Sequence, residues 1–156
     1  MTLAQDLLVA ASNAGLTIAT AESCTGGMVG AAITDIAGSS AVFDRGFVTY
    51  TNAAKMQMLK VKSETLDEFG AVSEQVAAQM AQGAVDHSDA DLAVSITGIA
   101  GPGGSEFKPE GRVCFGLSLG GETTTETVEF GAIGRANVRN AATEHALGLL
   151  LKAALR

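Results

Sequence analysis

Ser23, Tyr50 and Lys55 are the side chains through which this sequence could carry out covalent chemistry. A serine hydroxyl is a weak nucleophile that needs a base within hydrogen-bond reach. Lys55 could be that base if burial or neighbouring positive charge favours its neutral form, and Tyr50 could relay the proton. Position alone favours plainer roles: a helix cap for Ser23, a half-buried strand residue for Tyr50 and a solvated helix residue for Lys55.

Ser23 lies in a turn of small residues between a predicted strand and a predicted helix. The strand begins at Thr17 with β-branched side chains, and apolar residues recur at helical spacing after Gly27. Such a turn leaves backbone N–H groups free at the helix start, where the helix dipole favours an anion. We therefore expect the N–H groups around Thr25, Gly26 and Gly27 to hold an oxyanion. Cys24 is a rival nucleophile, but only one of two neighbouring residues leaving a strand can face the cleft.

A second glycine-rich stretch runs from Thr97 to Gly104. It has neither the Gly-Lys-Ser/Thr ending of a P-loop nor a GxGxxG pattern. Its backbone donors could lie against a phosphate or a ribose, or it could simply be a tight turn that needs glycine torsions. Arg135 and Arg139 lie four residues apart and could reach a phosphate, or a carboxylate across a subunit interface. For Arg139 a surface salt bridge is the favoured interpretation.

Histidine and metal chemistry are disfavoured by the spacing of the residues that would carry them. His87 and His145 fall on predicted helices, far from either glycine-rich turn. No group of His, Cys and Asp residues has metal-ligand spacing, so neither a metal nor a cofactor is expected. Cys24 and Cys114 show no disulfide pattern, which indicates free thiols in a reducing compartment.

Composition predicts one α/β domain over residues 1–156. The chain is 47% hydrophobic but only 4% aromatic, and its net charge is −7. Few aromatics and an acidic balance argue against binding to nucleic acid or to an anionic membrane. No apolar run is long enough to span a bilayer and the N-terminus lacks a basic segment, so a cytoplasmic location is the default expectation.

Hydrophobic periodicity predicts alternating helices and strands. Helices are expected at about 2–14, 26–36, 53–59, 73–88 and 136–155, and strands from Thr17 and at about 42–50, 92–96, 113–119 and 122–130. Lys60, Lys62 and Glu64 indicate a solvated connector. This order predicts a layered α/β domain with a mixed sheet, whose loops at 22–27, 50–55 and 97–104 converge at one edge.

Four ordered motifs together resemble the CinA C-terminal-domain family. They are Ala21-Glu22-Ser23-Cys24-Thr25-Gly26-Gly27, Gly46-Phe47-Val48-Thr49-Tyr50-Thr51-Asn52-Ala53-Ala54-Lys55, Gly70-Ala71-Val72-Ser73 and Thr97-Gly98-Ile99-Ala100-Gly101-Pro102-Gly103-Gly104. The resemblance covers nearly the whole chain. It implies a three-layer α/β/α sandwich with a mixed, mainly parallel sheet, a homodimer, and no metal. It also implies deamidation of nicotinamide mononucleotide to nicotinate mononucleotide and ammonia.

The resemblance assigns roles to particular residues and reverses the positional expectation for three of them. Ser23 matches the family's nucleophilic serine, Tyr50 and Lys55 match its activating partners, and the turn from Thr97 to Gly104 matches the pocket wall. The family often joins this domain to an N-terminal molybdopterin-binding-like domain, which is absent from the sequence given, so we expect the stand-alone form. The chain also has Ile133-Gly134 where the family often carries Gly-Asp.

The sequence therefore predicts an amidohydrolase of pyridine nucleotide salvage with a small-molecule nucleotide substrate. The expected catalytic residues are Ser23, Tyr50 and Lys55; the expected substrate-binding residues are Thr25, Gly26, Gly27, Asn52, Thr97, Gly98, Gly101, Gly103, Gly104 and Arg135. The alternative is a non-catalytic protein that binds nucleotides or serves as a competence- or damage-associated interaction module.

Overall fold

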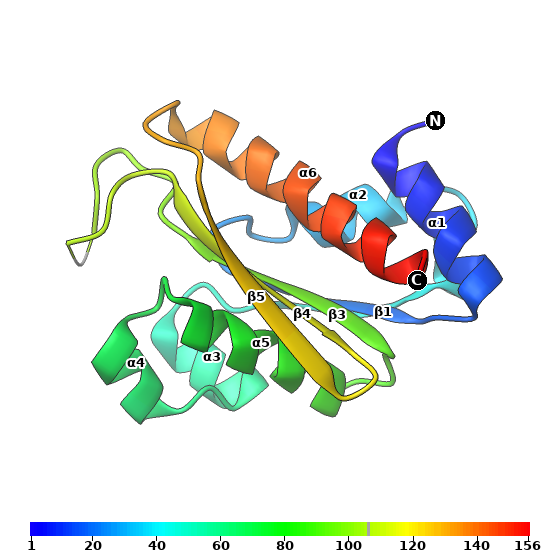
Figure 1. The fold of residues 1–156 in the computed structure, drawn as a ribbon, viewed down its shortest axis with the longest axis horizontal. Coiled ribbons are helices and arrows are strands. Elements are labelled where there is room, and N and C mark those ends of the chain that lie inside the picture. Colours follow the sequence, from blue (N-terminus) through cyan, green and yellow to red (C-terminus); the bar gives the residue numbers. More distant parts are fainter. Residues whose placement is uncertain (106) are drawn as a thin grey trace.

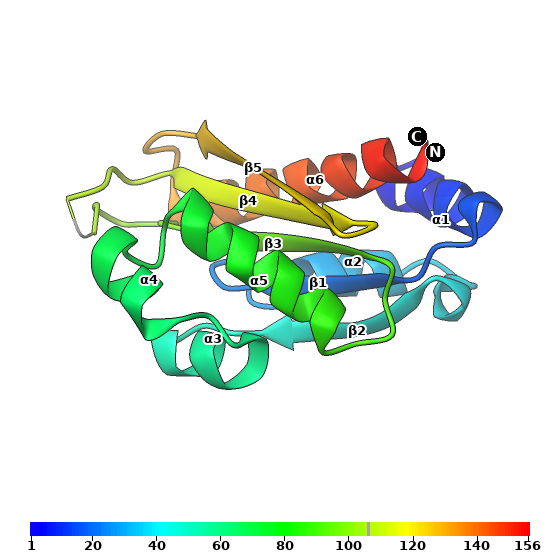
Figure 2. The same ribbon diagram turned by 60° about the horizontal axis from the view of Figure 1, so that its bottom comes forward.

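The computed structural model describes residues 1–105 and 107–156 and shows a sheet between two layers of helices (Figure 1). The elements in chain order are α1 (Leu3–Ala14), β1 (Ile18–Glu22), α2 (Met28–Thr34), η1 (Ser39–Ala41), β2 (Phe43–Val48), α3 (Asn52–Leu59), α4 (Ser63–Phe69), α5 (Glu74–Asp86), β3 (Leu92–Gly98), β4 (Arg112–Leu119), β5 (Glu122–Glu129) and α6 (Arg135–Ala154). Helices α1, α2 and α6 cover one face of the sheet, and α3, α4 and α5 cover the other (Figures 1 and 2). The three-layer α/β/α prediction is confirmed.

The sheet is mixed, with strand order β2-β1-β3-β4-β5. β1 pairs in parallel with both β2 and β3, whereas β3–β4 and β4–β5 are antiparallel. The chain leaves β1 over one face to reach β2, then crosses the other face to reach β3 on the opposite side of β1. Open α/β sheets bind ligands outside the carboxyl ends of their strands, at the point where the strand order reverses. In this sheet that point lies between the ends of β1 and β3.

Local sequence signals account for several of the element boundaries. The Thr2 side chain accepts from the Gln5 amide at 3.2 Å, and the Gln5 side chain accepts from the Thr2 amide. These two hydrogen bonds form the capping box that begins α1. Ser73 caps α5 in the same way, accepting from the Val76 amide at 3.2 Å. The two-residue hairpin between β4 and β5 is formed by Gly120 and Gly121, both with positive φ.

The segment predicted as a solvated connector contains a short helix instead. Helix α4 covers Ser63–Phe69, and its N-cap residue Lys62 makes no side-chain capping bond. Leu66 is its only buried residue, so the helix presents no apolar stripe from which it could be recognised. Its place in the fold comes from packing against α5.

Apolar side chains form one core on each face of the sheet. The larger core packs α1, α2 and α6 against residues such as Ile18, Val94 and Phe115, and the smaller packs α3–α5 against Ala19, Ala21 and Ala93. All five residues of β1 are buried because helices cover both of its faces. β5 lies at the sheet edge and alternates between exposed and half-buried residues, as its Thr- and Glu-rich sequence predicts.

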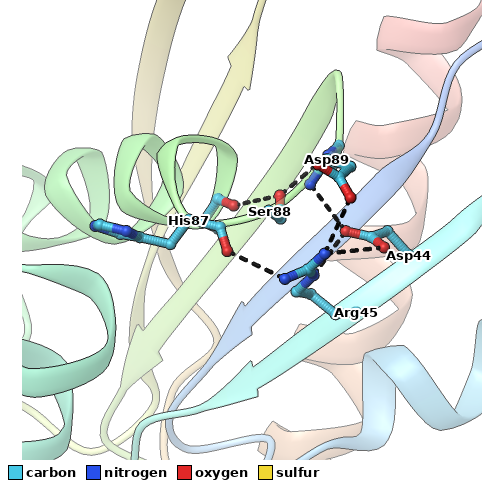
Figure 3. Close-up of polar contacts among 7 residues, drawn as sticks. Asp44, Arg45, His87, Ser88 and Asp89 are labelled. Carbon is cyan, nitrogen blue, oxygen red and sulfur yellow. Dashed lines mark hydrogen bonds and ion pairs between the residues drawn. The ribbon is translucent and has the colours of Figure 1, made fainter.

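A polar cluster joins the amino ends of β2 and β3, at the edge of the sheet opposite the turn after β1 (Figure 3). Arg45 lies 2.7 Å from Asp44 and 3.3 Å from Asp89, and it also donates to the His87 carbonyl. The Asp89 amide donates to Asp44 at 3.0 Å. The hydrogen bond from Arg45 lowers the pKa of Asp44. His87 is thus at the sheet edge away from both glycine-rich turns, where the sequence placed it.

None of the helices in the described part of the chain is long and apolar enough to cross a membrane.

Candidate active site

Lys55 and Ser23 meet in a buried contact at the carboxyl edge of the sheet. The Lys55 Nζ atom donates to Ser23 Oγ at 3.1 Å, although the two residues are 32 positions apart in the sequence. The amine also donates to the carbonyl oxygens of Thr49, at 3.0 Å, and Tyr50, at 3.4 Å. Lys55 is 1% exposed and Ser23 8%. The solvated role that position alone favours for Lys55 is therefore wrong.

Short connections after parallel strands bring these two residues together. Ser23 follows β1 directly, and its amide donates to the Ile96 carbonyl of β3 at 3.0 Å. After β2, the Thr49 amide donates to the Glu22 carbonyl at 2.8 Å, which holds the two strand ends in register. Helix α3 begins directly after this, and the Thr51 hydroxyl caps it by accepting from the Ala54 amide at 3.0 Å. Lys55 lies in the first turn of this helix and is buried.

Two of the backbone N–H groups after Ser23 already donate to acceptors within the protein. The Gly26 amide donates to the Ser23 carbonyl at 3.0 Å, and the Gly27 amide donates to Glu22 Oε1 at 3.1 Å. The Thr25 hydroxyl also donates to Glu22 Oε1, at 2.6 Å. The expectation that N–H groups around Thr25, Gly26 and Gly27 hold an oxyanion therefore fails for Gly26 and Gly27, because an internal carboxylate and a carbonyl already accept from them.

The conformation of this turn explains its glycines. Gly27, the N-cap of α2, has a φ of 108°, which residues with a side chain rarely adopt. A Cβ at Gly26 would lie 3.3 Å from Arg139 Nη2. Both glycines shape the turn that carries Ser23.

Cys24 is buried beside Ser23, and its thiol is protonated at neutral pH. Removal from water raises the pKa of this thiol to about 11. Cys24 lines the same cavity as Ser23, but the contact with Lys55 Nζ is made by the Ser23 hydroxyl.

A cavity of about 210 Å³ opens beside the Ser23–Lys55 contact. It gathers residues from all three loops that the sequence expects to converge. Its lining comprises Ser23, Cys24, Tyr50, Asn52, Lys55, Ala71, Val72, Thr97, Gly98, Ala100 and Arg135. Seven of the expected site residues (Ser23, Tyr50, Asn52, Lys55, Thr97, Gly98 and Arg135) thus face one space. The Thr97 hydroxyl donates to the Ala71 carbonyl at 2.8 Å, so toward a ligand it can act as an acceptor.

The glycine-rich stretch lines a second, adjoining cavity of about 280 Å³. Gly101, Gly103 and Gly104 lie here rather than beside Ser23, and Gly98, Ala100 and Arg135 belong to both cavities. Gly101 has a φ of 95°, and a Cβ there would lie 2.6 Å from the Glu110 carboxyl carbon, so the chain turns where only glycine fits. The two cavities thus adjoin, and Ser23 lines the first of them but not the second.

Arg135 and Tyr50 lie at the junction between the two cavities. Arg135 donates to the Gly101 carbonyl at 2.7 Å and to the Tyr50 hydroxyl at 3.1 Å. Tyr50 is 60% exposed, and it accepts from Lys55 through its backbone carbonyl. The phenol hydroxyl therefore points to Arg135, and a proton relay through it would need a side-chain rotation.

Arg139 does not have the surface role expected for it. Its Nε donates to the Cys24 carbonyl at 3.0 Å, and its Nη2 lies 3.4 Å from the Thr25 carbonyl. The guanidinium thus holds the turn that carries Ser23.

Sequence reasoning missed two residues that support the site. Glu22 is 1% exposed at the end of β1, and it accepts from the start of α2. Lys108 donates to the carbonyls of Phe69 and Val72 at 2.6 Å each, which ties the glycine-rich loop to the wall formed by residues 71–72. A charged residue closing an otherwise apolar buried strand was the available signal for Glu22; no pattern marked Lys108.

Across residues 1–105 and 107–156, no three His, Cys, Asp or Glu side chains are grouped closely enough to hold a metal ion.

Known proteins resemble this chain closely in both sequence and structure. The sequence matches the family described as the CinA C-terminal domain over residues 1–154. A curated relative from Escherichia coli strain K12, named nicotinamide-nucleotide amidohydrolase PncC, is 53% identical over 152 residues, covering 96% of this chain and 92% of that protein. A CinA-like protein from Chlorobium phaeobacteroides is 55% identical over 119 residues, which is 72% of this chain but only 28% of that longer protein.

Solved structures of proteins from the same family have the same fold as this chain. The competence/damage inducible protein CihA from Agrobacterium tumefaciens superposes with a TM-score of 0.94 at 50% identity, over 99% of this chain and 94% of that one. A CinA superfamily protein from Escherichia coli gives the same TM-score at 38% identity, over 97% of this chain and 88% of that one. With the site geometry and these matches, the chain belongs to the CinA C-terminal-domain family.

Proposed function

We propose that this protein hydrolyses the carboxamide of nicotinamide mononucleotide, releasing ammonia and nicotinate mononucleotide. The observation that carries the proposal is the buried 3.1 Å contact between Lys55 Nζ and Ser23 Oγ, facing a cavity. A serine paired with a buried amine is a suitable arrangement for acyl transfer. The name of the Escherichia coli relative, which aligns over nearly its whole length, supports a nicotinamide nucleotide as the substrate.

In the proposed reaction, Ser23 Oγ attacks the carboxamide carbon and passes its proton to Lys55 Nζ. General-base action requires the neutral amine, which can accept the Ser23 proton while it still donates to the Thr49 and Tyr50 carbonyls. The tetrahedral intermediate collapses as its C–N bond breaks, and the leaving NH₂ group takes the proton from Lys55 and departs as ammonia. Water then attacks the acyl-serine ester, which restores the Ser23 hydroxyl and releases the carboxylate product.

Negative charge on the tetrahedral oxygen needs donors other than the Gly26 and Gly27 amides. The Tyr50 hydroxyl and the Asn52 amide line the same cavity as Ser23 and can donate. We assign oxyanion stabilisation to this side of the cavity. A hydroxyl that already accepts from a guanidinium, as that of Tyr50 does, is polarised as a donor.

The two adjoining cavities fit the two parts of a nucleotide substrate. The carboxamide belongs beside Ser23, and the ribose and phosphate belong in the cavity of the glycine-rich stretch. Arg135, at the junction, is the cation placed to hold the phosphate, which matters in a chain whose net charge is −7. We further propose that the protein is a single-domain homodimer located in the cytoplasm. Its proposed role is in pyridine nucleotide salvage.

The test is ammonia release from a panel of carboxamide compounds by the purified protein. We expect turnover of nicotinamide mononucleotide and far slower turnover of free nicotinamide, which lacks the ribose phosphate. Binding of the mononucleotide without ammonia release would instead support a non-catalytic nucleotide-binding protein. If the protein neither binds nor turns over the mononucleotide, the result supports an interaction module.

A further inference from the structure

The carboxylate of Glu22 occupies the start of helix α2, one residue before Ser23. Glu22 Oε1 accepts from the Thr25 hydroxyl at 2.6 Å, the Gly27 amide at 3.1 Å and the Val29 amide at 3.0 Å. Glu22 Oε2 accepts from the Gly30 amide at 3.0 Å. Four donors therefore converge on one side chain that is 1% exposed. An anion from the protein itself takes the position at which a helix start would otherwise bind one from solution.

The carbonyl side of the same turn is held by a cation. Arg139, from α6, donates to the carbonyls of Cys24 and Thr25. The Ser23 amide is fixed to β3 through the Ile96 carbonyl. The turn is thus held by a carboxylate at the Gly27, Val29 and Gly30 amides and by a guanidinium at the two carbonyls before them. A buried carboxylate is costly unless its lone pairs are satisfied, and here four donors satisfy them.

Fixing this turn has a direct consequence for the Ser23 hydroxyl. The side-chain direction of Ser23 depends on the backbone torsions of the turn, and Lys55 approaches from a different element. Changes of about 1 Å in the position of a reacting group can cost roughly 100-fold in rate. A turn with free amides could relax by that amount.

We infer that Glu22 is a positioning residue for the Ser23 nucleophile, acting by holding the turn through the Thr25 hydroxyl and the α2 amides. The inference rests on the proposed amidohydrolase function. Glu22→Gln keeps an oxygen acceptor but places an NH₂ group against the Gly30 amide. It should lower kcat for nicotinamide mononucleotide by about 10- to 100-fold, with KM within about threefold of wild type. The substrate cavity is unchanged, so binding should be spared.

Two matched pairs of variants separate positioning from general destabilisation. Thr25→Val removes a donor to Glu22, whereas Thr25→Ser retains it and should restore most of kcat. Glu74→Gln removes another carboxylate held by two threonine hydroxyls, at 2.8 and 2.7 Å, but in the contact between α5 and β5. It should leave kcat unchanged. Circular dichroism at the assay temperature gives the folded fraction by which every rate is corrected.

Amide hydrogen exchange reports on the turn without reference to activity. In Glu22→Gln, exchange of the Gly27, Val29 and Gly30 amides should accelerate, while amides of β3 stay protected. The inference is supported if Glu22→Gln shows both faster exchange and a lower kcat, and if Thr25→Ser keeps most of the kcat that Thr25→Val loses. Faster exchange with wild-type kcat overturns it, as does a kcat loss that disappears when corrected for folded fraction. If Glu22→Gln fails to fold, the two Thr25 variants decide: equal kcat in both overturns the inference.

The wild-type protein and Ser23→Ala distinguish failure of this inference from failure of the proposed function. Absence of ammonia release from the wild type overturns the function, and with it the role assigned to Glu22. A wild type that turns over and a Ser23→Ala variant that does not leave the function standing, so that unimpaired Glu22→Gln then overturns the positioning role alone.

Discussion

Replacing Lys55 by methionine removes the amine and keeps a side chain of similar length in the same buried space. In the structure this eliminates the 3.1 Å donor to Ser23 Oγ and leaves the wall of the cavity in place. Positioned acid–base groups contribute about 10²- to 10⁴-fold to rate. We expect kcat for nicotinamide mononucleotide to fall by about 10³-fold, which corresponds to about 4 kcal/mol of transition-state stabilisation. KM should stay within about threefold.

The assay follows ammonia by an enzyme-coupled change in absorbance, with thermal melting to show that each variant is folded. Lys55→Arg is the matched control, because arginine keeps positive charge and donors but does not lose its proton. If Lys55 is the base, Lys55→Arg should be about as inactive as Lys55→Met. Wild-type kcat in Lys55→Met, within threefold and at equal folded fraction, would refute the reasoning. Substantial activity in Lys55→Arg alone would indicate that charge, not proton transfer, is what the residue supplies.

Three further predictions follow from other groups. Because burial raises the pKa of the Cys24 thiol to about 11, about one molecule in a thousand carries the thiolate at pH 8. Alkylation of Cys24 by iodoacetamide should therefore be slow until the protein is unfolded. Arg135→Ala should raise KM for the mononucleotide by about 10- to 100-fold through loss of a charge-assisted contact, and comparison with an unphosphorylated nucleoside should show a smaller change. Hydrogen bonds from Thr127 and Thr125 lower the pKa of Glu74 below its unfolded value, so the stability they contribute is present above about pH 4.5 and lost as pH falls through the folded value. The melting temperature of Glu74→Gln should therefore fall less than that of wild type on acidification, with an effect of at most about 1 kcal/mol because the site is close to solvent.

The parts of the fold with a local cause were predictable from sequence. The Thr2 capping box, the Ser73 cap and the Gly120-Gly121 hairpin each set a boundary through contacts within a few residues. Helix α4 was missed because its stability comes from packing against α5, and one buried leucine leaves no periodic pattern. Such a helix is decided by tertiary contacts that a single sequence does not display.

The loops that meet at the cavity were predictable from sequence, but the contacts among their side chains were not. The order of the loops indicated that Ser23, Lys55 and Thr97 would meet at one sheet edge, and they do. The family resemblance, rather than spacing, favoured an inward-facing lysine. Which groups occupy the N–H groups after Ser23 depends on where the Glu22 side chain points, and a strand pattern does not fix that for a residue buried on both sides.

The contact made by Arg139 also could not be predicted from the spacing of residues in the sequence. Its spacing from Arg135 suggested two cations on one helix face, yet one reaches the junction of the cavities and the other the carbonyls of the Ser23 turn. The choice between a surface ion pair and a backbone contact depends on what faces α6 across the core. That arrangement is set by the sheet order, which sequence periodicity alone does not establish.

The most direct test of the nucleophilic role of Ser23 is rapid-quench mass spectrometry of the protein during turnover of nicotinamide mononucleotide. The account predicts a transient adduct on Ser23 whose mass equals that of the substrate less ammonia, and neither adduct nor turnover in Ser23→Ala. Turnover by Ser23→Ala at the wild-type rate, or an adduct located on Cys24 instead, would contradict it.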